Sequence, residues 1–184
     1  MNASAPAAGT RFHHLPTPSF PADLAGRAAD LGAGFGYLSV ELLERCPGIT
    51  ALDLYEAEGR ALELARGNLA GVATAATLGF HWHDVTAGLP ERYDVIVTNP
   101  PFHTQGRADR PDIGRRFIAV AAEALRPGGR LWLVANRHLP YESVLNDSFG
   151  QVRTVAQRDG FKIIEATRAA AAPPPRREPR AERR

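Results

Sequence analysis

Cysteine is nearly absent from this chain of 184 residues. Cys46 is the one cysteine, so no disulfide can form within the chain and no set of cysteines could ligate zinc. The adjacent His13 and His14 could contact a metal, but no third ligand follows at a suitable spacing. We therefore predict no metal site, and the lack of disulfides fits a reducing cytoplasm.

The chain also lacks a long hydrophobic run. Although 44% of the residues are hydrophobic, no apolar stretch approaches the ~18 residues that a membrane helix needs. Met1–Thr10 has neither a charged n-region nor an apolar h-region, which argues against a signal peptide. We expect a cytoplasmic protein without a membrane partner, long enough for one domain with a sizeable core.

Net charge is small and unevenly placed. The formal charge is +2, yet six arginines and two glutamates lie between Arg168 and the C-terminus, which leaves 16 basic and 18 acidic side chains in residues 1–167. Charge alone therefore gives weak support for a nucleic-acid partner. Residues 169–184, rich in Pro, Ala and Arg, cannot bury a core and are expected to be disordered. Residues 1–25 are expected to form an irregular arm.

Strand and helix patterns alternate through residues 26–168, the expected domain. The expected strands are 28–31, 49–56, 78–84, 93–97, 130–135, 151–158 and 161–167, and the expected helices are 37–45, 57–69, 115–125 and 140–149. Asp159 and Gly160 give a strong hairpin signal between the last two strands. This order predicts a three-layer α/β/α sandwich with a mostly parallel sheet and a C-terminal antiparallel hairpin.

A glycine-rich turn with the pattern D-x-G-x-G-x-G follows the first expected strand, at residues 30–36. Gly32 and Gly34 allow a tight turn and a close approach to a ligand. Asp30, at the strand end, could accept a hydrogen bond from an ammonium group. A dinucleotide-binding G-x-G-x-x-G motif would place its third glycine at position 37, which is Tyr37. The spacing therefore indicates S-adenosylmethionine more than NAD.

Acidic residues end the next two expected strands. Asp53 and Glu56 lie about 20 residues past the glycines, where a carboxylate commonly binds both ribose hydroxyls. Asp53 fits the pattern of an apolar run followed by an acid best, and Glu56 is the alternative because the next helix starts late. Asp84 could accept from an adenine amino group, with the N–H of Val85 reaching a ring nitrogen.

The turn Asn99-Pro100-Pro101-Phe102 follows the buried strand 93–97. The two prolines make the turn stiff. The side-chain oxygen of Asn99 and the carbonyl of Pro100 are two acceptors that could take both N–H bonds of an exocyclic amine, which would direct its lone pair toward a methyl donor. Phe102 offers an apolar face on which a planar group can stack.

Four polar side chains, Asp30, Asp53, Asp84 and Asn99, fall at the carboxyl ends of expected strands. In mostly parallel sheets, ligands bind in the crevice beyond these ends. We therefore expect all four strands to contribute to one binding site.

At this point the chain resembles the class I S-adenosylmethionine-dependent methyltransferases, and more closely the small-subunit and large-subunit ribosomal RNA guanine-N2-methyltransferases. The resemblance covers about residues 26–168. The stretches that carry the closer resemblance are Asn99–His103 with Gly106, Val134–Tyr141 with Leu145 and Phe149-Gly150, and Phe161–Ile164.

The resemblance implies a Rossmann-like class I methyltransferase sheet and methyl transfer from S-adenosyl-L-methionine to the exocyclic N2 amine of a guanine in ribosomal RNA or a ribosomal subunit. The implied roles are Asp30, Gly32 and Gly34 at the methionine part of the cofactor, Asp53 or Glu56 at the ribose, Asp84 and Val85 at the adenine, Asn99 and Pro100 at the guanine amine, and Phe102 stacked on the base.

Two alternatives stay open: an N-methyltransferase for a protein glutamine or for adenine in nucleic acid, and a non-catalytic methyltransferase-like module that binds RNA or protein. Members of the family usually carry an N-terminal half that is a degenerate copy of the same fold. Because only about 25 residues precede Gly26, we expect weak cofactor binding and slow or absent methylation of naked ribosomal RNA by the 184-residue chain.

Overall fold

One sheet of seven strands forms the centre of the computed structural model, which describes residues 18–101 and 111–171. The strands are β1 (Ala25–Leu31), β2 (Gly48–Glu56), β3 (Thr77–Trp82), β4 (Tyr93–Thr98), β5 (Leu125–Asn136), β6 (Gln151–Arg158) and β7 (Phe161–Thr167). The helices are α1 (Tyr37–Arg45), α2 (Gly59–Leu69), the 3₁₀ helix η1 (Val85–Ala87), α3 (Pro111–Ala124) and α4 (Glu142–Ser148). Most of the expected arm and of the expected tail, residues 1–17 and 172–184, lies outside the described residues.

The strands follow the order β3-β2-β1-β4-β5-β7-β6 across the sheet. Strands β1 to β5 are parallel, whereas β7 runs antiparallel between β5 and β6. Asp159 and Gly160 form the turn of the final hairpin, and both adopt a positive φ. The predicted three-layer sandwich with a mostly parallel sheet and an antiparallel hairpin is therefore confirmed.

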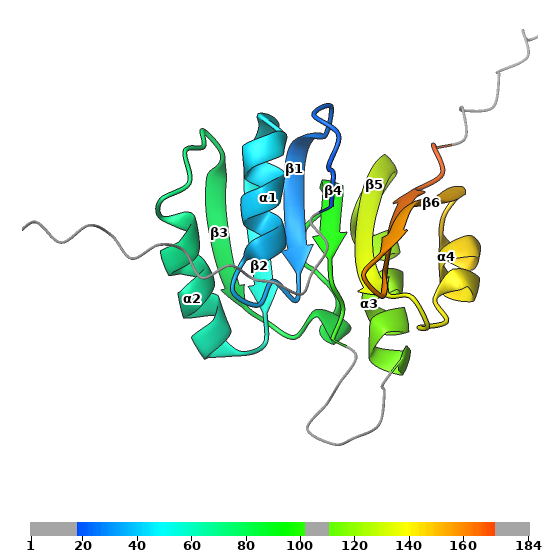
Figure 1. Cartoon of the computed structure of the whole chain (residues 1–184). Helices are drawn as coiled ribbons and strands as arrows, with labels where there is room; N and C mark the ends of the chain where they lie inside the picture. Colours follow the sequence, from blue (N-terminus) through cyan, green and yellow to red (C-terminus); the bar gives the residue numbers. More distant parts are fainter. Residues whose placement is uncertain (1–17, 102–110, 172–184) are drawn as a thin grey trace, which may run out of the picture.

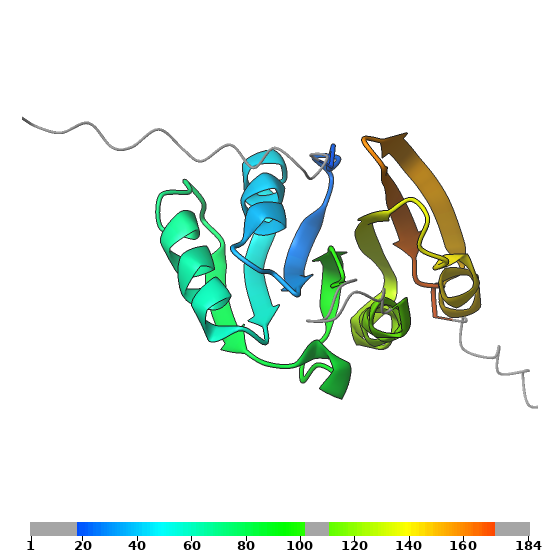
Figure 2. The same cartoon turned by 60° about the horizontal axis from the view of Figure 1, so that its bottom comes forward.

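Two helical layers cover the sheet, α1 and α2 on one face and α3 and α4 on the other (Figures 1 and 2). The alternation of side chains along the central strands divides the core between these faces. The core on the α1 and α2 face includes Ala28, Val95, Val97, Trp132 and Val134. The core on the α3 and α4 face includes Ala29, Ile96, Leu131, Leu133 and Phe117.

Several elements begin or end at residues that differ from the expected ones. Helix α3 begins at Pro111 rather than near residue 115, because proline is well tolerated in a first helical turn, where its missing N–H has no partner to lose. Strand β5 begins at Leu125 rather than at residue 130 and pairs with β4 through a register shift between Tyr93 and Val95. Strand β3 ends at Trp82, two residues earlier than expected.

Residues 18–24 contribute to the core although they form neither helix nor strand. Phe20 and Leu24 are buried, and the Phe20 ring meets the Trp132 ring edge-on at a centroid distance of 5.5 Å. The Cys46 thiol donates to the carbonyl of Pro21 at 3.3 Å. The hydrophobic core therefore extends upstream of Gly26, the residue at which the domain was expected to begin.

Candidate active site

A cleft of about 440 Å³ lies at the carboxyl edge of the sheet, the lower edge in Figure 1. The residues predicted from the sequence that line this cleft are Gly32, Glu56, Asp84, Val85 and Asn99. They come from the ends of β1, β2, β3 and β4. Of the four polar side chains expected at one crevice, Asp84 and Asn99 line this cleft, whereas Asp30 and Asp53 do not.

The glycine-rich turn after β1 folds over the end of β2. The N–H groups of Gly32 and Ala33 both donate to the carbonyl of Tyr55, at 2.9 and 3.1 Å. Gly34 has a φ of +54°, and nothing lies within 4 Å of the position that a Cβ would occupy there. The backbone of Gly34 thus borders open space, which allows a ligand to approach it closely.

Glu56 is the acid that ends β2. Its Oε2 accepts from the N–H of Gly34 at 2.8 Å, and its Oε1 accepts from the N–H of Glu58 at 2.8 Å. These two bonds fix the carboxylate beside the cleft, and each oxygen has a further lone pair. Glu56 could therefore accept hydrogen bonds from a pair of ligand hydroxyls without losing its backbone partners.

Asp30 lies one residue before the end of β1, and it is buried, with 1% exposure. Its Oδ2 accepts from the Ser39 hydroxyl, in the first turn of α1, at 2.7 Å. Its Oδ1 has no hydrogen-bond partner among the described residues. Burial raises the pKa of this carboxyl to about 7. An open acceptor in a buried place is typical of a site that receives a ligand group.

Asp84 and Val85 follow β3, where Asp84 caps η1. The carboxylate of Asp84 accepts from both the N–H and the hydroxyl of Thr86 through Oδ1, at 2.9 and 2.7 Å. These bonds lower the pKa of Asp84 below its usual value. The residue is exposed, so the carboxylate is ionised and accessible to a ligand amine.

Asp53, the residue favoured from the sequence for the ribose, does not line the cleft. It lies three residues before the end of β2. Its carboxylate accepts from Arg27 at 2.8 Å and from the Tyr93 hydroxyl at 3.1 Å, and it lies 2.9 Å from His81 Nε2. Burial alone would raise the pKa of this carboxyl, but its hydrogen-bond partners outweigh burial and lower the pKa. The carboxylate of Asp53 therefore has its partners within the chain, in Arg27, His81 and Tyr93.

Asn99 follows β4 directly, is half-buried and lines the cleft. Pro100 is buried, and Pro101 is exposed and lines the cleft beside Asn99. The hydroxyl of Thr98 donates to the carbonyl of Leu31 at 2.7 Å, which ties the end of β4 to the end of β1. Phe102 lies outside the described residues, so its stacking role stays a prediction.

Some residues that line the cleft were not predicted from the sequence as site residues: Ala57, His83, Thr86, Pro101, Ile113 and Phe117. Ile113 and Phe117 are four residues apart on α3, so they share one helix face. The guanidinium of Arg116 donates to the carbonyl of Thr86 at 3.0 Å and ties α3 to η1. The i, i+4 spacing of these two apolar residues was the available signal, but a helix expected from residue 115 excluded Ile113.

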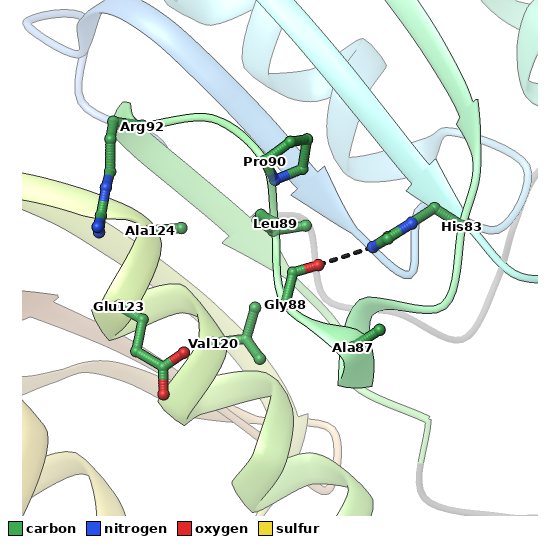
Figure 3. A pocket seen from close by; sticks show the side chains of 9 residues that line it. All are labelled: His83, Ala87, Gly88, Leu89, Pro90, Arg92, Val120, Glu123 and Ala124. Carbon is green, nitrogen blue, oxygen red and sulfur yellow. Dashed lines mark hydrogen bonds between the residues drawn. The ribbon is translucent and has the colours of Figure 1, made fainter.

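Figure 3 shows a second cavity of about 430 Å³, between the segment 87–92 and the end of α3. It adjoins the cleft through His83, whose Nε2 lies 2.7 Å from the carbonyl oxygen of Gly88. Among the described residues, none predicted from the sequence as catalytic or cofactor-binding lines this cavity. The predicted site residues that line a cavity therefore line the cleft at the carboxyl edge.

Two absences hold for the described part of the chain. Within residues 18–101 and 111–171, no helix is both long enough and apolar enough to span a bilayer. In the same ranges, no group of three or more His, Cys, Asp or Glu side chains is arranged to hold a metal ion.

The sheet order with β7 inserted antiparallel, and a cleft beyond β1, β2 and β4, define a Rossmann-like methyltransferase fold. A family model described as "Methyltransferase small domain" matches residues 9–165. The chain therefore belongs to the methyltransferase small domain family.

Individual relatives agree with this assignment. The chain is 37% identical over 143 residues to ribosomal RNA small subunit methyltransferase C of Alcanivorax borkumensis, and 36% identical over 157 residues to ribosomal RNA large subunit methyltransferase G of the same organism. The matches cover 77% and 84% of this chain, but 42% and 39% of the relatives. The chain thus spans about two fifths of the length of these curated relatives.

A solved structure is similar as well. It is the 16S rRNA N2 methyltransferase RsmC of T. thermophilus, in complex with AdoMet and guanosine, at 33% identity and a TM-score of 0.65. The match covers 77% of this chain and 37% of that chain.

Proposed function

We propose that this chain binds S-adenosyl-L-methionine in the cleft and transfers its methyl group to the exocyclic N2 amine of a guanine in ribosomal RNA, free or in a ribosomal subunit. The observation that carries the proposal is that Glu56, Asp84 and Asn99 line one cleft. Three relatives or neighbours whose names specify ribosomal RNA methyltransferases support the substrate class. A ribosomal substrate would place the reaction in the cytoplasm.

The acidic residues of the cleft fit the polar groups of this cofactor. Glu56 has two oriented oxygens for the two ribose hydroxyls. The ionised Asp84 can accept from the adenine amino group, and the apolar Ile113 and Phe117 can pack against the adenine ring. We infer that Glu56, rather than Asp53, binds the ribose, because Asp53 already has three partners.

Asp30 fits the ammonium group of the methionine part. Asp30 lies in β1, before the glycine turn, and its partner Ser39 lies in α1, after the turn. The Oδ1 of Asp30 has no partner among the described residues, so it can accept from a ligand. A cation beside this oxygen would stabilise the ionised carboxylate and compensate for its burial. Gly32 and Gly34 would border the same part of the cofactor through their backbone.

The turn after β4 would bind the amine that accepts the methyl group. When bound, the cofactor supplies an electrophilic methyl group on a sulfonium. The side-chain oxygen of Asn99 and the carbonyl of Pro100 would accept the two N–H bonds of the amine and direct its lone pair into the cleft. Transfer would form an N–C bond as the C–S bond of the cofactor breaks, and the extra proton on the nitrogen would pass to water. The contribution of the protein is mainly positioning.

The substitution Asn99→Ala tests this assignment. We expect the affinity for S-adenosylmethionine, measured by calorimetry, to stay within about threefold, since Asn99 acts on the acceptor. Methyl transfer to ribosomal RNA should fall by about 10²–10³-fold, as for loss of one positioned polar group in an active site. Mass spectrometry of the digested RNA would identify N2-methylguanosine as the product.

The control is Asn136→Ala, which removes an amide at the end of the neighbouring strand β5. It should leave both cofactor binding and methyl transfer near the wild-type values. Wild-type turnover in Asn99→Ala would contradict the assignment of the turn. Methylated adenine or glutamine as the product, or cofactor binding without any transfer, would favour one of the alternative functions.

A further inference from the structure

The carboxyl edge of the sheet continues beyond Asn99 along β5, β7 and β6. Strand β5 lies beside β4, with Thr98 opposite Leu133, and it ends at Asn136 on the same edge. Strand β7 begins at Phe161 opposite Asn136, and β6 ends at Arg158 opposite Phe161. The loop after β5 therefore lies next to the end of β4, and the turn between β6 and β7 lies beside the end of β5.

Exposed basic side chains gather along this part of the edge. We call them the basic ridge: Arg115 of α3, Arg137 and His138 of the loop after β5, and Arg158 at the end of β6. These elements are in direct contact. The hydroxyl of Tyr141 occupies the space beside Gly114 of α3 that a Cβ would need, and the N–H of Arg137 donates to the carbonyl of Gly160 at 2.8 Å.

The pairing of arginines differs between the basic ridge and the opposite edge. At the amino edge, Arg126 pairs with Asp94, and Arg130 pairs with both Glu165 and Asp23. Neither Arg115 nor Arg137 has a carboxylate within 4 Å in the described part of the chain. Exposed charges without a partner keep their full potential for an outside anion.

Exposed acids on the same elements do not cancel this charge. Asp112 and Asp159 are the acidic residues that accompany the ridge, against its three arginines. On the other side of Asn99, by contrast, the edge carries the carboxylates of Glu56 and Asp84. The carboxyl edge is therefore acidic on one side of Asn99 and basic on the other.

The loop that carries Arg137 is held in place by a buried lysine. Lys162 Nζ donates to the carbonyl of Leu139 at 2.6 Å and pairs with Glu142. The nitrogen is buried and its charge is compensated, so Lys162 positions the loop and is not available to a ligand. A loop fixed in this way presents Arg137 without a large ordering cost on binding.

We propose that the basic ridge binds the phosphate backbone of the RNA strand that presents its guanine to Asn99, and this inference rests on the proposed function of the cleft. Phosphates match the guanidinium groups of Arg115 and Arg137, which have no carboxylate partner among the described residues, in charge and geometry. The carboxylates on the opposite side of Asn99 would repel an RNA strand. Together, these charges direct the RNA along β5, β7 and β6 and away from the cofactor.

The test uses the full chain and a 5′-fluorescein-labelled RNA hairpin with guanines in its loop. Fluorescence anisotropy gives the Kd at several salt concentrations, with S-adenosylmethionine present. The double variant Arg115→Ala/Arg137→Ala should bind about tenfold more weakly. Its slope of log Kd against log salt should be smaller by about 1.4–1.8, since each lost phosphate contact accounts for about 0.7–0.9. The affinity for S-adenosylmethionine should not change.

Two further variants serve as controls. Arg115→Lys/Arg137→Lys keeps both charges and should keep most of the affinity and the salt slope. Arg92→Ala removes an exposed arginine at the amino end of β4 that also lacks a carboxylate within 4 Å in the described residues. It should bind RNA like the wild type.

The outcomes separate this inference from the proposed function. Wild-type affinity and salt slope in the double alanine variant would refute the basic ridge even if the protein methylates guanine. So would an equal loss in Arg92→Ala, or no RNA binding by the wild type. Conversely, the expected loss of RNA binding in a protein that neither binds the cofactor nor transfers methyl groups would uphold the ridge and overturn the proposed function.

Discussion

Asp30 in β1 and Glu165 in β7 are both buried carboxylates of the same sheet, with exposures of 1% and 6%. Glu165 accepts from Arg130 at 2.6 Å through Oε1 and from Arg153 through Oε2. Asp30 accepts only from Ser39, and its Oδ1 has no partner among the described residues. Both oxygens of the carboxylate in β7 thus have a partner within the chain, whereas the carboxylate at the end of β1 has one open oxygen.

The difference indicates which buried charge supports the fold and which one serves a ligand. A buried carboxylate with guanidinium partners on both oxygens is costly to disrupt, because its partners would lose their counter-charge. A buried carboxylate with an open oxygen costs stability until a cation arrives. Loss of the Glu165 charge should therefore lower stability, whereas loss of the Asp30 charge should lower cofactor affinity.

The largest expected effect is that of Glu165→Gln. Loss of the charge shared by Arg130 and Arg153 should lower the free energy of unfolding by ~2–3 kcal/mol, below the usual range for a buried pair because Arg153 is well exposed. The affinity for S-adenosylmethionine should change less than twofold. Urea unfolding and calorimetry measure the two quantities. Unchanged stability would show that the Arg–Glu cluster around β7 is not structural.

Next in size is the effect of Asp30→Asn on cofactor affinity. Loss of a charged acceptor for the ammonium group should raise the Kd for S-adenosylmethionine by about 10- to 100-fold, equivalent to ~1.5–3 kcal/mol. The free energy of unfolding of the ligand-free protein at pH 8 should not fall, since the burial cost of the charge is removed as well. If stability falls while affinity is retained, Asp30 is a structural residue like Glu165.

The pH dependence of Asp30 gives a smaller, more specific test. Its pKa of about 7 lies above the value in the unfolded chain, so the folded state holds the proton more tightly. The free energy of unfolding attributable to Asp30 therefore falls as pH rises from about 4 to about 7. Cofactor binding favours the ionised form, so affinity should rise about tenfold between pH 6 and pH 8.

Measuring the wild type beside Asp30→Asn isolates this effect, because other titrating groups, including the amine of the ligand, contribute equally to both. The variant should lack the rise in affinity that the wild type shows between pH 6 and pH 8. Parallel pH profiles of the two proteins would exclude an ionising Asp30 at the cofactor.

The smallest expected effect is a difference in cofactor affinity between variants of two acids of β2, Glu56 and Asp53. Glu56→Gln should weaken cofactor binding by about five- to tenfold, ~1–1.4 kcal/mol, because a neutral amide is a poorer acceptor for the ribose hydroxyls. Asp53→Asn should leave the affinity within twofold and lower the free energy of unfolding by ~1–2 kcal/mol through its partners Arg27 and His81. The reverse pattern of affinities would assign the ribose to Asp53.

Local patterns in the sequence determined most of the secondary structure. The apolar run before Asn99, the glycines after Asp30 and the Asp159-Gly160 turn depend on backbone preferences that neighbouring residues impose. Such preferences act over a few residues, so the order of strands and helices and the parallel character of the sheet could be predicted. The placing of Glu56, Asp84 and Asn99 at or just after the ends of strands followed from the same patterns.

Only the tertiary structure decided which acid of β2 faces the cleft. The strand continues to Glu56 because it pairs with β3 up to Trp82, and Asp53 is drawn into a network with Arg27 and Tyr93 from other strands. The insertion of β7 between β5 and β6, which brings Arg158 near Arg137, is equally non-local. Register and side-chain pairing arise between segments that are distant in the chain, so no local pattern specifies them.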